Sequence, residues 1–303
     1  MKIKSQFYGE RMLQKIAKPM SLKRKVACKF TCRECGLVLV EVMISLSIGL
    51  LLISLLMGIY LACQQSLKLE TALNNIQANA KDAAAILTME VHQAGNIGCA
   101  RLTNDFPITP YQQYQLNAEN KIVGNAYSEL TLRHAEYPNV FLTSSMQDNH
   151  KIITSKNIQF DPGEILLISS CERAEIFVSG EVKQRNGMQE ITLISPLHHK
   201  YEKYAEVSRL LINKFYIAKT RRKYMDGSAI YALFVENSHH QNMELVAGVD
   251  QMEMKYTQQK AGRLQEVSAG EVGDWSQVLG VAMDFKLHAP PLKKSWHVYA
   301  ALN

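Results

Sequence analysis

The hydrophobic pattern of the chain begins with one long apolar run, CGLVLVEVMISLSIGLLLISLLMGIYLAC, at residues 35–63. From Val42 to Cys63 no residue carries a charge, and as an α-helix this stretch would extend for about 33 Å. That length is sufficient to cross a hydrocarbon core of about 30 Å, and it exceeds the apolar region of an ordinary secretory signal. The pattern predicts a single membrane span over residues 37–63.

Apolar residues then recur every three or four positions, as on one face of an amphipathic helix. They are Leu69, Leu73, Ile76, Ala80, Ala83, Leu87, Val91 and Ala94. Gly95 and Gly98 follow and are expected to end the helix. Together with the span, this half at residues 64–95 predicts one helix from Leu37 to Ala94, about 87 Å long if unbroken. A coiled coil is the alternative, but the many alanines favour packing on the protein's own β-domain.

Downstream of the helix the pattern changes to short β-like runs. They lie at Glu129–Leu132, Val140–Thr143, Glu164–Ser169, Glu175–Ser179, Glu190–Ser195, Leu210–Ile217, Ile230–Val235 and Met252–Tyr256. The run at residues 165–168 is apolar on both faces and predicts a buried central strand, whereas residues 252–256 alternate and predict one wet face. Asp226-Gly227 indicates a hairpin turn. We predict an α+β protein: a long N-terminal helix packed on an antiparallel β-sheet head at residues 96–303, with a link between two sheets near 196–206.

The charge is distributed unevenly, which changes what the net value of +6 means. Residues 1–36 hold 10 of the 34 Lys and Arg residues and 2 of the 28 Asp and Glu residues, which leaves 24 basic and 26 acidic groups for the rest. The positive-inside rule then places this leader in the cytoplasm and the head outside. The apolar fraction of 47% excludes a disordered, collagen-like or disulfide-miniprotein chain.

Glu41 interrupts the apolar run, where a carboxylate costs up to about 3 kcal/mol. One interpretation is an interfacial acid at the start of the helix, where the helix dipole favours negative charge. The string Gly36-Leu37-Val38-Leu39-Val40-Glu41 behind a basic leader, however, resembles the class III signal of type IV pilins and type II secretion pseudopilins.

That resemblance implies that a prepilin peptidase removes residues 1–36 by cutting after Gly36, and that Leu37 becomes the methylated N-terminus. Leu37 stands where the family usually has Phe, and a start at Met20 instead of Met1 would shorten the long leader. The resemblance also implies that Glu41 sets the register between subunits by pairing with the new amino group of a neighbour, a use that suits a buried ion pair.

Three further strings resemble the PilW family of minor pilins, in matching order. They are Ala94–Cys99 (AGNIGC), Ile165–Phe177 (ILLISSCERAEIF) and Glu244–Val249 (ELVAGV), the last followed by a Tyr256 strand and by Trp275 with Val278 and Val281. The resemblance implies a minor pilin of the inner membrane, with a periplasmic head, that joins other minor pilins and the major pilin at the assembly platform. It would start fibre assembly for twitching, adhesion or DNA uptake, and would finally lie at or near the pilus tip.

The six cysteines separate by compartment. Cys28, Cys32 and Cys35 lie in the leader, where thiols stay reduced, and their spacing lacks a fourth ligand for zinc. Cys63 lies at the outer edge of the span, as a free thiol, a packing residue or a weak lipoprotein-like ending. Cys99 and Cys171 are the pair left in the oxidising space, both fall in the family-like strings, and we expect them to form a disulfide.

No motif for catalysis, nucleotide binding or metal binding is present in the sequence, so we expect neither an enzyme nor a cofactor. The adjacent pairs His198-His199 and His239-His240 favour loop residues over metal ligands. Lys219–Lys223 (KTRRK) predicts a solvated loop, with a DNA or surface contact as the weaker interpretation. Two other functions stay open: a minor pseudopilin of type II secretion, and a single-span membrane-anchored periplasmic binding or sensor domain.

Overall fold

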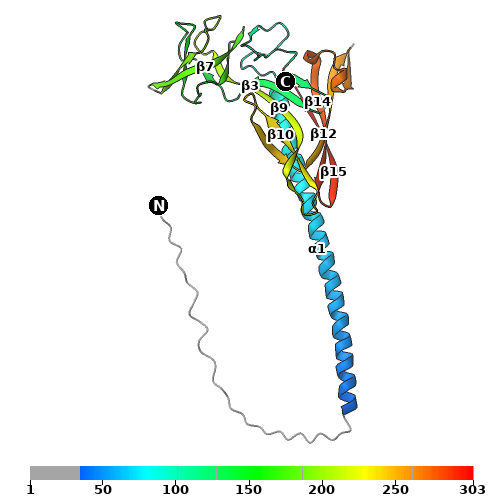
Figure 1. The fold of residues 1–303 in the computed structure, drawn as a ribbon. Coiled ribbons are helices and arrows are strands. Elements are labelled where there is room, and N and C mark those ends of the chain that lie inside the picture. Colours follow the sequence, from blue (N-terminus) through cyan, green and yellow to red (C-terminus); the bar gives the residue numbers. More distant parts are fainter. Residues whose placement is uncertain (1–34, 101, 127, 186, 261, 303) are drawn as a thin grey trace, which may run out of the picture. The chain divides into compact units, whose positions relative to one another are not determined.

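A computed structural model of the protein describes residues 35–302 except 101, 127, 186 and 261, with side chains described from Val38 (Figure 1). The predicted leader, including Cys28, Cys32 and both candidate starts Met1 and Met20, lies outside the described residues apart from its last two positions. The described chain divides into two compact units, of which the first ends at Cys63 and the second begins at Gln64.

One helix, α1 (Cys35–Gln93), contains both predicted helical halves. In the first unit its large apolar side chains from Val38 to Leu61 are 49–68% exposed. Among the described residues, α1 is the one helix that is long and apolar enough to cross a membrane. A helix that is apolar all round and unburied by protein needs an apolar solvent, so the first unit is a candidate membrane span.

In the second unit α1 buries one face of small and aliphatic residues. The buried residues are Ala72, Ile76, Ala80, Ala83, Leu87, Val91 and Ala94. Leu69 and Leu73, which the periodicity assigned to the same stripe, are instead 45% and 37% exposed. Leu69 lies N-terminal to Ala72, the first buried position, whereas Leu73 lies at the margin of the face that Ala72 and Ile76 bury. Packing on the chain's own strands confirms that this stripe lies on the head.

The head consists of two sheets. The larger has the strand order β11-β10-β9-β6-β7-β8-β5, with β3 and β4 pairing with β9, β2 with β3, and β1 with β7. Its strands are β1 (Ile108–Thr109), β2 (Ile122–Gly124), β3 (Leu130–Ala135), β4 (Val140–Phe141), β5 (Lys151–Ser155), β6 (Ile165–Ser169), β7 (Ala174–Arg185), β8 (Met188–Leu193), β9 (Glu206–Lys223), β10 (Ala229–Glu236) and β11 (Asn242–Ala247). All pairs are antiparallel except β1 with β7.

The smaller sheet is antiparallel, with the strand order β13-β12-β14-β15. Its elements are β12 (Val249–Lys260), β13 (Arg263–Val267), the 3₁₀ turns η1 (Ala269–Glu271) and η2 (Trp275–Gln277), β14 (Val278–Ala289) and β15 (Leu292–Ala301). Each of the eight predicted strands falls on an observed one, and the α+β class is confirmed.

The junction between the sheets differs from the prediction. The segment 196–206 connects β8 to β9, which belong to the same sheet, whereas the change of sheet occurs at Gly248, between β11 and β12. Gly248 has a φ of +76°, and an added Cβ would lie 3.0 Å from the His288 carbonyl oxygen. A left-handed residue in close contact with a backbone is a position where glycine is favoured. The composition of 196–206 reflects a long loop rather than a sheet boundary.

The main core joins the helix to both sheets. It contains the buried face of α1 with residues of β3, β9 and β10 from the larger sheet and of β12 and β14 from the smaller. Tyr256 is fully buried there, and its ring meets Trp275 edge-on at a centroid distance of 4.9 Å. Two smaller cores lie around Phe160 and Ile97.

Leu87→Ala should lower the free energy of unfolding of the head by about 2–5 kcal/mol, because the residue is fully buried and its removal leaves a cavity. Leu69→Ala removes the same atoms from an exposed part of the same helix and should cost less than about 0.5 kcal/mol. Denaturant unfolding in detergent, followed by the fluorescence of Trp275 and Trp296, measures both. Equal losses would contradict the observed boundary of the packed helix.

Candidate functional site

Gly36, Leu37 and Glu41, the residues of the proposed processing signal, all lie at the start of α1. Glu41 is exposed in the first unit, and only its backbone carbonyl is used, as the acceptor for the Ser45 hydroxyl at 2.8 Å. Within the part of the chain that the structure describes, its carboxylate has no hydrogen bond and no ion pair. A carboxylate in an apolar segment with no partner among the described residues is the feature that most requires an explanation.

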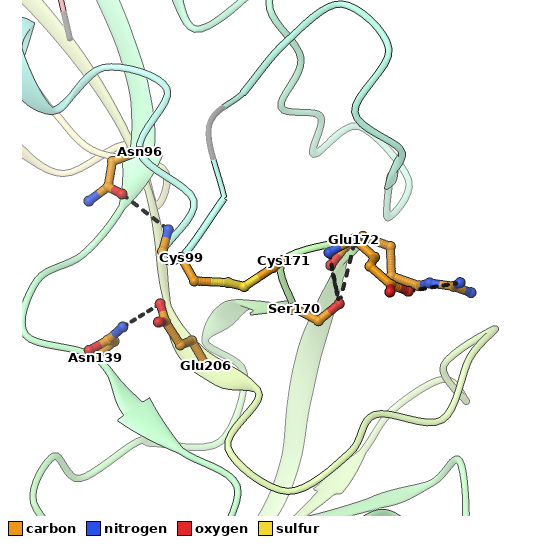
Figure 2. The surroundings of a disulfide bond; sticks show 9 residues. Asn96, Cys99, Asn139, Ser170, Cys171, Glu172 and Glu206 are labelled. Atoms are coloured by element: carbon orange, nitrogen blue, oxygen red, sulfur yellow. Dashed lines mark hydrogen bonds and ion pairs between the residues drawn. A yellow bond between two sulfur atoms is a disulfide. The ribbon is translucent and has the colours of Figure 1, made fainter.

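Cys99 and Cys171 form a disulfide, with their Cα atoms 5.5 Å apart (Figure 2). Cys99 follows the end of α1, and Cys171 lies in the turn between β6 and β7. Both half-cystines are exposed. The bond therefore joins the segment that follows α1 to the central hairpin of the larger sheet, and this predicted pair is confirmed.

The AGNIGC string has a conformational cause. Gly95 and Gly98 have φ angles of +79° and +96°, and the Asn96 side chain accepts the Gly98 N–H at 3.1 Å. An added Cβ at Gly98 would lie 2.0 Å from a carboxylate oxygen of Glu206. Glu206 also accepts the Asn139 amide at 2.6 Å beside the disulfide (Figure 2). Burial raises the pKa of Glu206 above its ordinary value, although the hydrogen bonds from the Asn139 side chain and the Cys99 backbone act to lower it.

A partly buried polar cluster joins α1 to the larger sheet. Glu90 of α1 accepts the Asn213 side-chain amide of β9 at 3.0 Å, and its carboxylate lies 3.3 Å from His134 Nε2 of β3. His134 is 1% exposed, and its Nδ1 lies 3.0 Å from the Ala135 carbonyl oxygen. Both ring nitrogens of His134 therefore face oxygen atoms of the cluster.

The cluster tunes the ionisation of Glu90. Burial alone would raise its pKa, but the hydrogen bonds from His134 and Asn213 and the nearby histidine outweigh that effect and lower the pKa below its ordinary value. The ionised form is thus the one that the folded head stabilises. No motif marks these three residues, which are separated by 44 and 79 positions in sequence, so the sequence analysis did not find them.

Glu175 forms a second buried carboxylate site, which no sequence pattern marked. The carboxylate is 2% exposed and accepts the backbone N–H groups of His198 and His199 at 2.7 and 2.9 Å. The Nδ1 atoms of the same two histidines lie 3.2 and 2.7 Å from it. His198 and His199 lie in the β8–β9 loop, as predicted, and both side chains turn to this one acceptor. The tyrosine in this loop, Tyr201, is buried, and burial raises its pKa.

Among the described residues no group of three or more His, Cys, Asp or Glu side chains is arranged to hold a metal ion. His239-His240 lies in the turn between β10 and β11, as predicted for a loop. Cys63 is an exposed free cysteine. The described residues thus place one unpartnered carboxylate in the apolar part of α1, and polar and covalent links within the head. No protein-family model, curated protein or solved structure matches this chain.

Glu90→Gln should remove part of the acid sensitivity of the head. Because the folded pKa of Glu90 lies below the unfolded value of about 4.3, its stabilisation is present above that pH and is lost as pH falls through the folded pKa. The variant should lose about 1–3 kcal/mol at neutral pH and show a flatter fall of unfolding free energy toward pH 3. Glu70→Gln, at an exposed position of the same helix, is the control. Parallel pH curves for wild type and Glu90→Gln would contradict the assignment.

Replacing Cys99 and Cys171 together by Ser should lower the unfolding free energy by roughly 4 kcal/mol, because the bond closes a loop with a sequence separation of 72 residues. Cys63→Ser should have no such effect. Chemical unfolding and non-reducing gel mobility measure the two variants. Alkylation of both Cys99 and Cys171 in the unreduced native protein would show that the bond does not form.

Proposed function

We propose that this protein is a minor pilin of the type IV pilus, of the PilW kind. The observation that carries the proposal is Glu41: an acid five residues after Gly36, in a helix apolar all round, with no partner in the described chain. In a processed subunit the amino group of a neighbour's Leu37 would neutralise it. Such a contact would fix the axial position of one helix against the next, which is what a helical filament requires.

The second support is the way in which one helix serves two environments. Its first half is exposed and apolar, which suits lipid or the packed helices of a filament core. Its second half is buried on one face against its own head. A subunit built in this manner can wait in the inner membrane and then transfer to a fibre without refolding its head.

The third support is the path that a pulling force would follow. Load on α1 would pass at its end through Cys99–Cys171 into the β6–β7 hairpin, and beside it through Glu90 into β3 and β9. The covalent path does not depend on the helix–sheet core alone. That arrangement suits a fibre component that bears tension.

The partners that follow are those of pilus assembly. A prepilin peptidase would cut after Gly36 and release Leu37 for methylation, with the leader in the cytoplasm and the head in the periplasm. Other minor pilins and the major pilin would then pack against the exposed half of α1 at the inner-membrane assembly platform. The subunit would lie at or near the pilus tip, because minor pilins that start a fibre enter it first.

Glu41→Val tests this function. The variant should be cut as efficiently as wild type, so that N-terminal sequencing of the membrane-extracted protein gives Leu37 as the first residue in both. It should, however, fail to restore piliation in a strain lacking the gene, because the carboxylate is absent. Glu70→Val, outside the span on the same helix, is the matched control and should restore piliation.

Three outcomes would overturn the proposal. A wild-type chain recovered with residues 1–36 still attached excludes a processed pilin. Normal pilus number with Glu41→Val excludes the register role. Loss of enzyme secretion rather than of twitching or DNA uptake in the deletion strain assigns the chain to type II secretion instead.

A further inference from the structure

Strand β9 runs alongside α1 in the opposite direction. At one point Asn213 of β9 contacts Glu90 of α1. Farther along β9, Ala218 lies in register with Ala232 of β10 and, through it, with Ala247 of β11. The Ala247 carbonyl accepts the amide of Asn79 of α1 at 2.8 Å. Asn213 and Ala218 are five residues apart along β9, and Glu90 and Asn79 are eleven residues apart along α1. Both separations correspond to about 17 Å. Beyond Ala218, the stretch Lys219–Lys223 and the following turn continue toward the Gln64 end of the second unit.

The β14–β15 hairpin ends in the same region of the second unit. His92 Nδ1 lies 3.0 Å from the Ala301 carbonyl oxygen, and the ten residues of β15 extend back about 30 Å from there, to the level of Ala72, the first buried helix residue. The Tyr224 hydroxyl of the β9–β10 turn donates to the His288 carbonyl of β14 at 2.6 Å. The two hairpin tips therefore lie together beside the start of the packed helix, as the β9, β10 and β15 ribbons show in Figure 1.

These tips carry a concentration of positive charge. Lys219, Arg221, Lys223, Lys293 and Lys294 are exposed, and none of the described residues forms an ion pair with them. Two other basic side chains nearby are neutralised: Arg222 pairs with Glu244, and Lys286 with Glu253. Between Lys223 and Asp226, the side chain of Met225 is fully exposed at the end of the turn. We call Lys219, Arg221, Lys223, Met225, Lys293 and Lys294 the hairpin-tip surface.

We infer that the hairpin-tip surface binds the anionic head groups of the membrane that α1 crosses. Unpaired basic residues around one protruding apolar side chain are the combination that favours an anionic lipid interface. A cavity of about 570 Å³ between β10, β12, β14 and β15 is large enough to admit a phosphate head group, and it is lined by the unpaired Lys293 and Lys294, by the paired Lys286 and by one acid, Asp250. Nine positions separate Cys63, the last residue of the apolar run, from Ala72, so the polypeptide tethers the second unit to the candidate membrane span by a short segment.

Lipid fits these observations better than nucleic acid, although both are polyanions. An exposed Met at the centre of a basic surface gains nothing from a solvated phosphate backbone, but it gains from the acyl boundary of a bilayer. The tether also raises the local concentration of lipid and of no other anion. Contact with lipid head groups would keep the head bound at the membrane surface. This inference does not require that the chain be a pilin.

The test uses the full chain in lipid nanodiscs, with Met225→Cys labelled by a fluorophore and with Cys28, Cys32, Cys35 and Cys63 changed to Ser. Quenching by nitroxide-bearing head groups should be strong in discs containing phosphatidylglycerol. It should be weak in pure phosphatidylcholine and at 1 M salt, where the screening length is about 3 Å. The same label at Leu264→Cys, on the exposed β13 at the opposite end of β12, should stay unquenched in every disc.

Changing Lys219, Arg221, Lys223, Lys293 and Lys294 together to Gln should lower the ratio of quenched to unquenched heads at least about tenfold, since one basic residue near an anionic surface contributes about fivefold. The matched control changes five exposed basic residues elsewhere, Lys156, Lys183, Arg185, Lys200 and Lys203, and should keep the contact. Protection of Cys99 and Cys171 from alkylation verifies that both variants are folded.

Several results would overturn the inference. They are an absence of quenching at position 225 in anionic discs, equal quenching in phosphatidylcholine, or full contact by the five-Gln variant. Duplex DNA that binds the wild type in phosphatidylcholine discs, but not the five-Gln variant, with no lipid contact in either, would assign the surface to nucleic acid instead. None of these results depends on cleavage at Gly36 or on pilus assembly, so the two proposals can fail separately.

Discussion

The structure depends on the burial of one face of α1 between Ala72 and Ala94. Ala80 and Ala83 in the middle of this face are completely buried. With Leu87 and Val91 they belong to one core that also contains residues of β3, β9, β12 and β14. Because one helical face contacts both sheets, neither sheet would have a complete core without it.

An apolar stripe of similar residues leaves the axial position of a helix poorly defined, because shifting it by one turn exchanges one aliphatic contact for another. Directional contacts remove that freedom. Asn79 donates to the Ala247 carbonyl, and Glu90 binds His134 and Asn213 about three turns farther along. The lowered pKa of Glu90 indicates that the head holds it as a carboxylate in spite of its burial. Hydrophobic burial supplies most of the stability, and these polar contacts specify one arrangement.

Periodicity predicted the elements whose burial is set locally. The stripe from Ile76 to Ala94, the wholly buried β6 and the one-sided β12 each follow from a repeat of 3.6 or 2 residues. It failed where the tertiary context decides: Leu69 continues the stripe but no strand covers it, and β14 and β15 were missed although they form half of the smaller sheet. The charge of Lys219–Lys223 predicted a loop, and this prediction was wrong. The segment is the end of β9, because β10 pairs with it from Ala229 onward.

The contacts of buried carboxylates were beyond any local pattern. Glu175 meets His198 and His199 only because β6, β7 and β9 bring a loop back over β7, and nothing within a few residues of Glu175 indicates this. The cysteine pair was predictable for the opposite reason: a disulfide can be proposed from compartment and residue type, without knowing the sheet order. Contacts between residues that are distant in the sequence can be assigned only from the three-dimensional fold.

Glu41 and Glu90 are two glutamates of the same helix, and they differ in whether the described chain supplies a partner for the carboxylate. Glu90 is buried by the head, and the head supplies two nitrogen donors that hold it ionised. Glu41 lies in an apolar segment where its carboxylate also requires a hydrogen-bond donor or a positive charge, and the described chain supplies neither. An acid retained in an apolar helix without a partner is costly, and the cost falls only if a positive group arrives from elsewhere. In the proposed pilin, cleavage after Gly36 would give a neighbouring subunit a free amino group at the same depth, and this group would be the positive partner of Glu41. A glutamate that faced only water at the membrane interface would not need such a partner.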